Sequence, residues 1–169
     1  LGLVCLAPLL DSPLRAPVDR CVKASDASPS GAAVVAVTVP QEAADTLWRQ
    51  RVRSGGRTNC AVIGAPGNTR CDSAIGELLE SLPAREMLRF SFGNKRPPHI
   101  NVGEMRSRRA LWRTLAQDPR AHGRRHLVVY DSSATVGAGN KGRSPKSGML
   151  REGRLTYPYL LAADCVEGT

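Results

Sequence analysis

Residues 124–148 read RRHLVVYDSSATVGAGNKGRSPKSG, and this stretch sets the expected architecture of the chain. The apolar run from Leu127 to Tyr130 is short and nearly continuous, which is typical of a strand buried on both faces of a sheet. The run stops at Asp131, and small polar residues, glycines and cations follow, where we expect a short helix. A buried strand that ends on a carboxylate before a helix indicates an α/β domain with a polar site at the strand end.

Three more strands are expected upstream of this one. Apolar, β-branched runs at about residues 20–26 and 32–39 flank ASPSG, whose proline, serines and glycine are a turn signal. The pattern predicts a hairpin whose first strand ends on Asp26. A further strand is expected at residues 86–94, where EMLRFSFGN alternates apolar and polar side chains.

The span between the second and third strands, about residues 40–85, is expected to be a helical insertion. A helix after Pro40 should stop at the glycine pair 55–56. A short strand at 60–63 and a short helix at 72–82 are expected next.

A longer helix is predicted from residue 102 to 117, because the stretch HINVGEMRSRRALWRTLAQDP stops before Pro119. Glu104 shares one face of this helix with Leu111 and Leu115. A carboxylate is therefore expected on the side that docks on the sheet.

The element order predicts a mixed sheet. Strands one to three should be antiparallel, and the helix at 102–117 should cross over to a fourth strand parallel to the first. A last helix is expected within residues 147–164, broken near Pro158.

The charge distribution points to a polyanionic partner. The chain has 24 Lys and Arg against 15 Asp and Glu, a net charge of +9, and the excess lies between residues 89 and 154. This pattern favours nucleic acid, with an idle basic surface as the alternative. Aromatic residues make up only 4% of the chain, so backbone contacts are expected rather than base stacking.

The apolar runs and the cysteines of the sequence indicate the cellular compartment in which we expect the protein. No apolar run approaches the roughly 18 residues of a membrane span, and LGLVCLAPLL at the start lacks the basic residues of a signal peptide. The five cysteines are scattered without a CxxC pair, which favours a reducing, intracellular compartment (cytoplasm or nucleus). For the same reason His122 and His126 are not expected to bind zinc.

Three acids hold consistent positions in the expected topology: Asp26 and Asp131 end neighbouring parallel strands, and Glu104 lies on the crossover helix. Their carboxylates should converge at the carboxyl edge of the sheet, where a divalent cation would relieve their repulsion. Such a site beside a basic surface suits two-metal hydrolysis of a phosphodiester. Each acid also has an ordinary alternative, since Asp26 could form an Asx turn, Glu104 could be a solvated helix residue or pair with Arg108, and Asp131 could cap a helix.

Three segments together carry a resemblance to a known family. VKASDASPSGAAVV, KRPPHINVGEMRS and LVVYDSSATVGAGNKGRS resemble the ribonuclease H-like domain of retroelement polyproteins, in particular of DIRS-like reverse-transcriptase elements of unicellular eukaryotes. The resemblance covers about residues 5–165. It implies a ribonuclease H-like sheet of the five-stranded type with flanking helices and a last strand that is incomplete in this chain. Residues 1–19 then resemble the connection from an upstream polymerase domain.

The resemblance implies a function and its residues. The domain would cut the RNA strand of RNA–DNA hybrids with Mg²⁺ or Mn²⁺ held by Asp26, Glu104 and Asp131, as part of a reverse transcriptase. The basic residues Lys141, Arg143, Lys146 and Arg106 would contact the nucleic-acid backbone. The family's fourth metal carboxylate has no counterpart here, and Asp164 is a poor substitute. An inactive domain that binds nucleic acid or acts as a scaffold is therefore the alternative, and an unrelated basic RNA-binding protein is a third hypothesis.

Overall fold

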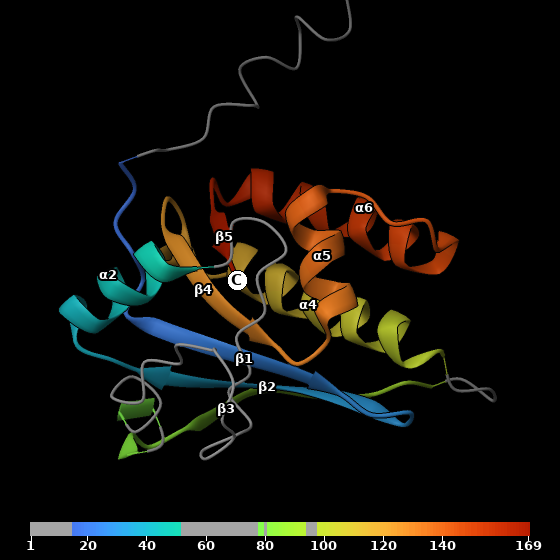
Figure 1. Cartoon of the computed structure of the whole chain (residues 1–169), viewed down its shortest axis with the longest axis horizontal. Helices are drawn as coiled ribbons and strands as arrows, with labels where there is room; N and C mark the ends of the chain where they lie inside the picture. Colours follow the sequence, from blue (N-terminus) through green and yellow to red (C-terminus); the bar gives the residue numbers. More distant parts are fainter. Residues whose placement is uncertain (1–14, 52–77, 80, 94–97) are drawn as a thin grey trace, which may run out of the picture.

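The computed structural model describes residues 15–51, 78–79, 81–93 and 98–169. Within these residues the strands form one mixed sheet in the order β3-β2-β1-β4-β5. The strands are β1 (Cys21–Ala27), β2 (Gly31–Thr38), β3 (Arg85–Ser91), β4 (Arg125–Tyr130) and β5 (Val166–Gly168). β1, β2 and β3 are antiparallel neighbours, whereas β4 pairs in parallel with β1 and with β5. The expected α/β fold with a mixed five-stranded sheet is confirmed (Figure 1).

The hairpin of β1 and β2 forms where the turn signal predicted it. The pairing runs from Cys21 opposite Thr38 to Ala27 opposite Ala32. The backbone N–H of Ser28 donates to the carbonyl of Gly31 at 2.8 Å, which closes the turn. A Cβ atom on Gly31 would lie 2.5 Å from a carbonyl oxygen of β3, so this position requires glycine.

The helical insertion is described only in part. α2 (Gln41–Gln50) begins directly after Pro40, as predicted. The short strand expected at 60–63 and most of the helix expected at 72–82 lie outside the described residues. The end of the lead-in is tied to the sheet, because Val18 forms a parallel bridge with Arg125 and the N–H of Asp19 donates to the Arg125 carbonyl at 2.8 Å.

The crossover helix α4 (Ile100–Ala116) starts two residues before the predicted position. The side chain of His99 caps the helix, because it accepts a hydrogen bond from the Asn101 N–H at 3.3 Å. Histidine is not among the preferred N-cap residues, so the sequence pattern did not indicate this start. Glu104, Leu111 and Leu115 share the buried face of the helix, as expected.

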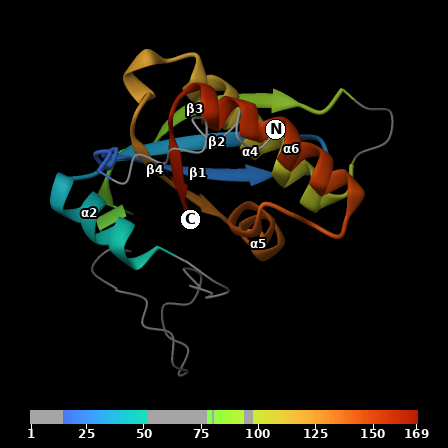
Figure 2. The ribbon, with the colours of Figure 1, turned by 90° about the horizontal axis from the view of Figure 1, so that it is seen from above.

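Helices cover both faces of the sheet. α4 packs against one face around Val34, Trp112 and Val128, and α6 (Ser147–Ala162) packs on the outer side of α4 (Figure 1). α2 packs through Trp48 in a second apolar cluster that includes Leu127, whose side chain lies on the opposite face from that of its neighbour Val128. Figure 2 shows α2 well separated from α4 and α6.

α6 contradicts one prediction, because Pro158 does not break it. The helix continues from Ser147 to Ala162 with Pro158 inside it. The residue is exposed, so water can reach the carbonyl that loses its amide donor. Ala163 is the C-cap of α6, the N–H of Cys165 donates to the Leu160 carbonyl at 3.0 Å, and Asp164 holds the left-handed conformation with φ of 50°.

Candidate active site

The register of β1 and β4 brings Asp26 and Asp131 together. Ser25 lies opposite Tyr130 in the parallel pairing, so Asp26, the next residue of β1, lies beside Asp131, the first residue after β4. Neighbouring strands lie about 5 Å apart. Both carboxylates are exposed at this edge of the sheet, where the parallel strands β1 and β4 end.

Glu104 supplies the third carboxylate of the candidate site. Its side chain lies in the first turns of α4 and the residue is only 3% exposed. Burial raises the pKa of Glu104 to about 7; the charges of Asp26 and, to a smaller extent, Asp131 also raise it, while a hydrogen bond from the backbone of Ala27 opposes the shift. The two exposed carboxylates therefore lie close enough to Glu104 to act on its charge.

One oxygen of Glu104 has no protein partner. Oε2 is buried and accepts no hydrogen bond among the described residues. A buried carboxylate oxygen without a donor is costly, and a bound cation is a natural way to satisfy it.

The ordinary explanation for Glu104 is contradicted by the structure. Arg108 lies one turn further along α4, but its guanidinium binds Glu167 of β5 through both Nε and Nη2. Tyr130 donates its hydroxyl to the same carboxylate at 2.6 Å. Arg108 therefore does not form the predicted ion pair with Glu104.

The ordinary explanations for the two aspartates also fail. α5 (Ser133–Lys141) is capped by Ser132, whose hydroxyl accepts from the Thr135 N–H, and not by Asp131. The hairpin turn is closed by Ser28, while Asp26 is a paired strand residue opposite Ala33. The Asp26 carboxylate accepts from the N–H of Ala27 at 2.8 Å through Oδ1, and its second oxygen accepts no hydrogen bond from the described residues. Neither acid is used by the local structure in the way that the alternatives required.

The three carboxylates lie near one another, but they are not arranged as the ligands of one metal ion. In the described part of the chain, no three His, Cys, Asp or Glu side chains converge as ligands of one ion. The chemistry of the donors nevertheless fits a hard divalent cation, because all three are carboxylates, two of them are exposed and the third carries an unsatisfied oxygen. Rotation of the exposed Asp26 and Asp131 side chains is the movement that binding would need.

The packing of α4 on β1 explains a glycine beside Glu104. A Cβ atom at Gly103 would lie 3.2 Å from the ring of Phe92 and 3.5 Å from Cβ of Ala27. Glycine costs about 1 kcal/mol of helix propensity relative to alanine. Here it permits the first turn of α4 to lie against the end of β1 and the Phe92 ring.

The predicted nucleic-acid contacts divide into two groups. Lys141, Arg143 and Lys146 are exposed where α5 leads into α6, and their side chains form no hydrogen bond or ion pair with other described residues. Arg106 differs, because its guanidinium pairs with Glu152 at 3.3 Å and lies 5.8 Å from the centre of the Phe92 ring. The structure therefore places Arg106 in an internal ion pair.

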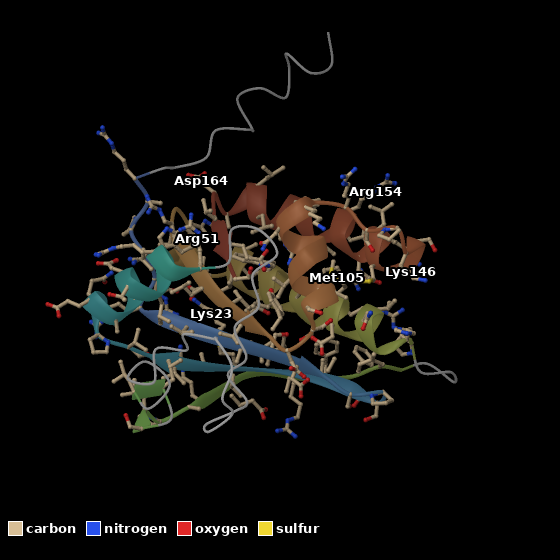
Figure 3. The ribbon with its side chains drawn as sticks, viewed as in Figure 1. Lys23, Arg51, Met105, Lys146, Arg154 and Asp164 are labelled. Atoms are coloured by element: carbon tan, nitrogen blue, oxygen red, sulfur yellow. The ribbon has the colours of Figure 1, made fainter. Side chains whose placement is uncertain are left out.

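Two further arginines extend this basic surface and were not singled out from the sequence. Arg151 and Arg154 are exposed on α6, one and two turns after Lys146. Figure 3 labels Lys146 and Arg154 along the outer side of the helix. Helical spacing would have grouped Arg151 with Arg154, because positions three or four apart share a face.

Asp164 and the two histidines lie outside the candidate site. Asp164 is exposed at the C-terminal end of α6, away from the arrowheads of β1 and β4 (Figure 3). His126 is fully buried between Lys23 and Asp19, and His122 is exposed with its ring bonded to the Ala116 carbonyl. Neither histidine belongs to a group of metal ligands in the described residues.

Comparisons with family models, with curated proteins and with solved structures gave no match for this chain. No described helix combines the length and the apolar character that crossing a membrane requires.

Proposed function

We propose that this chain is a ribonuclease H-type nuclease domain that uses divalent cations to cleave the RNA strand of RNA–DNA hybrids. The observation that carries the proposal is the parallel register that sets Asp26 beside Asp131, with the buried Glu104 coupled to both. Open α/β sheets bind their ligands at this edge. The choice of a hybrid, and the upstream reverse transcriptase as a partner domain, rest on the resemblance of the sequence to the retroelement family.

The roles of the three carboxylates follow from their surroundings. Asp26 and Asp131 present exposed oxygens to solvent, so they would make the first contacts with a cation and share it across the two strands. Glu104 would contribute its unsatisfied oxygen from the buried side. When bound, Mg²⁺ or Mn²⁺ would supply the Lewis acidity that activates water and stabilises the leaving oxygen.

The basic surface would position the substrate. Lys141, Arg143 and Lys146 carry charge without an acidic partner in the described part of the chain, and Arg151 and Arg154 add exposed charge along α6. Such residues hold phosphates and carry no base specificity of their own. The scarcity of aromatic residues fits this mode of binding.

The test is cleavage of a hybrid labelled on its RNA strand, with Mg²⁺ and with EDTA. Asp26→Asn, Glu104→Gln and Asp131→Asn should each lower the rate by more than the roughly 10–100-fold that loss of an outer contact to a metal site costs. Asp164→Asn is the matched control, since it changes an exposed carboxylate away from the site. Cleavage that persists in EDTA, or that survives all three site variants, would exclude the proposal.

A second candidate function is binding of nucleic acid without cleavage. It is favoured by the absence of three convergent ligands among the described residues. This candidate predicts that the parent protein binds the hybrid with an affinity that falls steeply with salt, while Mg²⁺ produces no cut. The triple variant Lys141→Ala, Arg143→Ala, Lys146→Ala should then weaken binding and reduce the salt dependence.

A further inference from the structure

We infer that Ser25 and Ser107 are a positioning pair that sets the distance between Asp26 and Glu104 for binding of the cation. The inference rests on the proposed function and adds two residues to its site. The hydroxyl oxygens of the two serines lie 2.6 Å apart and form a hydrogen bond between β1 and α4. The residues are 3% and 0% exposed.

The place of this bond in the fold connects it to the carboxylates. Ser25 directly precedes Asp26 on β1, and Ser107 follows Glu104 by three positions, so it lies on the same face of α4. A shift of the helix along the strand would break the bond and move Glu104 relative to Asp26. The bond therefore helps to set the position of Glu104 along β1, on which a cation shared with Asp26 would depend.

Two directional contacts join α4 to β1 at this point: the Ser25–Ser107 bond, and the hydrogen bond from the backbone of Ala27 to the Glu104 carboxylate. Gly103 faces Cβ of Ala27 and the edge of the Phe92 ring, and both contacts are apolar. Apolar contacts are non-directional, whereas a hydrogen bond demands a defined distance and angle.

Stability alone does not account for the two serines. Replacing both partners of a buried hydrogen bond by apolar groups of similar shape is often nearly neutral, because neither polar group is left unsatisfied. Two alanines would thus serve an inert helix–strand contact as well. We explain the hydroxyl pair by the need to keep α4 at a defined position along β1.

The experiment compares the parent with Ser25→Ala, Ser107→Ala and the double variant. Thr156→Val is the matched control, because its hydroxyl is equally buried and donates to the Glu152 carbonyl at 2.8 Å within α6. One readout is the rise of the melting temperature with Mg²⁺ concentration, which needs no catalysis. The other is the Mg²⁺ concentration at half-maximal cleavage of the hybrid.

We expect the serine variants to need about 10-fold more Mg²⁺ in both readouts, as for other residues that orient metal ligands. The control should keep the parent's midpoint, and the double variant should keep nearly the parent's stability in urea. Equal Mg²⁺ midpoints in the parent, the serine variants and the control would overturn the positioning role while leaving the nuclease proposal intact. A parent that shows neither a Mg²⁺ shift nor cleavage would overturn both.

Discussion

Arg108 binds the carboxylate of Glu167, 59 residues away in the chain, and not that of Glu104 one turn away. The pair joins α4 to the last strand, and Tyr130 of β4 donates to the same carboxylate. The contacts of the Glu167 carboxylate thus connect α4, β4 and β5. Because Arg108 is engaged in them, it does not pair with Glu104.

Removing one member of this pair should destabilise the fold strongly. Arg108 is 2% and the Glu167 side chain 10% exposed, so Arg108→Ala or Glu167→Ala would leave a buried charge unpaired. Such changes cost about 3–5 kcal/mol. The double variant Arg108→Met, Glu167→Leu should cost clearly less than the sum of the two single changes, as measured by urea unfolding. Additive losses would show that the two residues act independently.

Glu104 should make stability depend on pH without metal. Its pKa in the folded protein is raised from 4.5 to about 7, so the folded state binds the proton more tightly than the unfolded state does. Stability should fall as pH rises from about 4.5 to 7 and then level off, by at most about 3 kcal/mol from this group.

The variant Glu104→Gln tests this dependence, because it removes the titrating group and keeps the size of the side chain. It should unfold at a higher urea concentration than the parent at pH 8, and the two should differ little at pH 4.5. Mg²⁺ should restore part of the parent's stability at pH 8 and should stabilise the variant less, because the variant lacks the third carboxylate. A parent whose stability is level between pH 5 and 8, in step with the variant, would contradict this account.

Asp19 should give the opposite pH dependence at low pH. Burial alone would raise its pKa, but hydrogen bonds from His126 and Lys23 and the charge of Lys23 outweigh burial and hold it well below 3.8. The stability it contributes is therefore present above pH 3.8 and is lost as pH falls further. Asp19→Asn should lower stability at pH 7 by about 2 kcal/mol and flatten the acid limb of the pH–stability curve. An unchanged acid limb in chemical unfolding would count against the network.

Asp164 holds a backbone conformation that glycine adopts at lower cost. Its φ of 50° lies in the left-handed region directly after α6, and the residue is exposed. Asp164→Gly should raise the free energy of unfolding by about 0.5–1 kcal/mol, whereas Asp164→Ala should not raise it. Thermal unfolding of both variants checks the difference, and a stabilising alanine would show that the conformation is not the source of the effect.

Several elements follow directly from local sequence patterns. The hairpin follows from ASPSG between two β-branched runs, and β4 from an apolar run bounded by charge. The positions of Asp26 and Asp131 follow as well, because Asp26 is the last but one residue of β1 and Asp131 directly follows β4. These patterns are readable because turn chemistry and side-chain periodicity act over a few residues.

Other features depend on contacts between distant segments and have no local signal. Arg108 could bind Glu104 or Glu167, and the packing of β5 beside β4 decided the partner. The helix start at Ile100 depended on a histidine cap, and the continuation of α6 depended on Pro158 facing solvent. The local preferences are worth about 0.2–0.5 kcal/mol for a helical ion pair, about 1 kcal/mol for a cap and about 3 kcal/mol for an interior proline, and tertiary packing or solvation can override each of them.

The sequence by itself determined which carboxylates stand at the strand ends and that the second half of the chain is basic. Only the tertiary structure decided that Ser25 lies opposite Tyr130, that Ser25 bonds to Ser107, and that Glu104 keeps a buried oxygen without a partner. The physical reason is that strand ends are set by short-range patterning. The spacing and ionisation of charged groups depend instead on register, burial and the partners that other charges find across the fold.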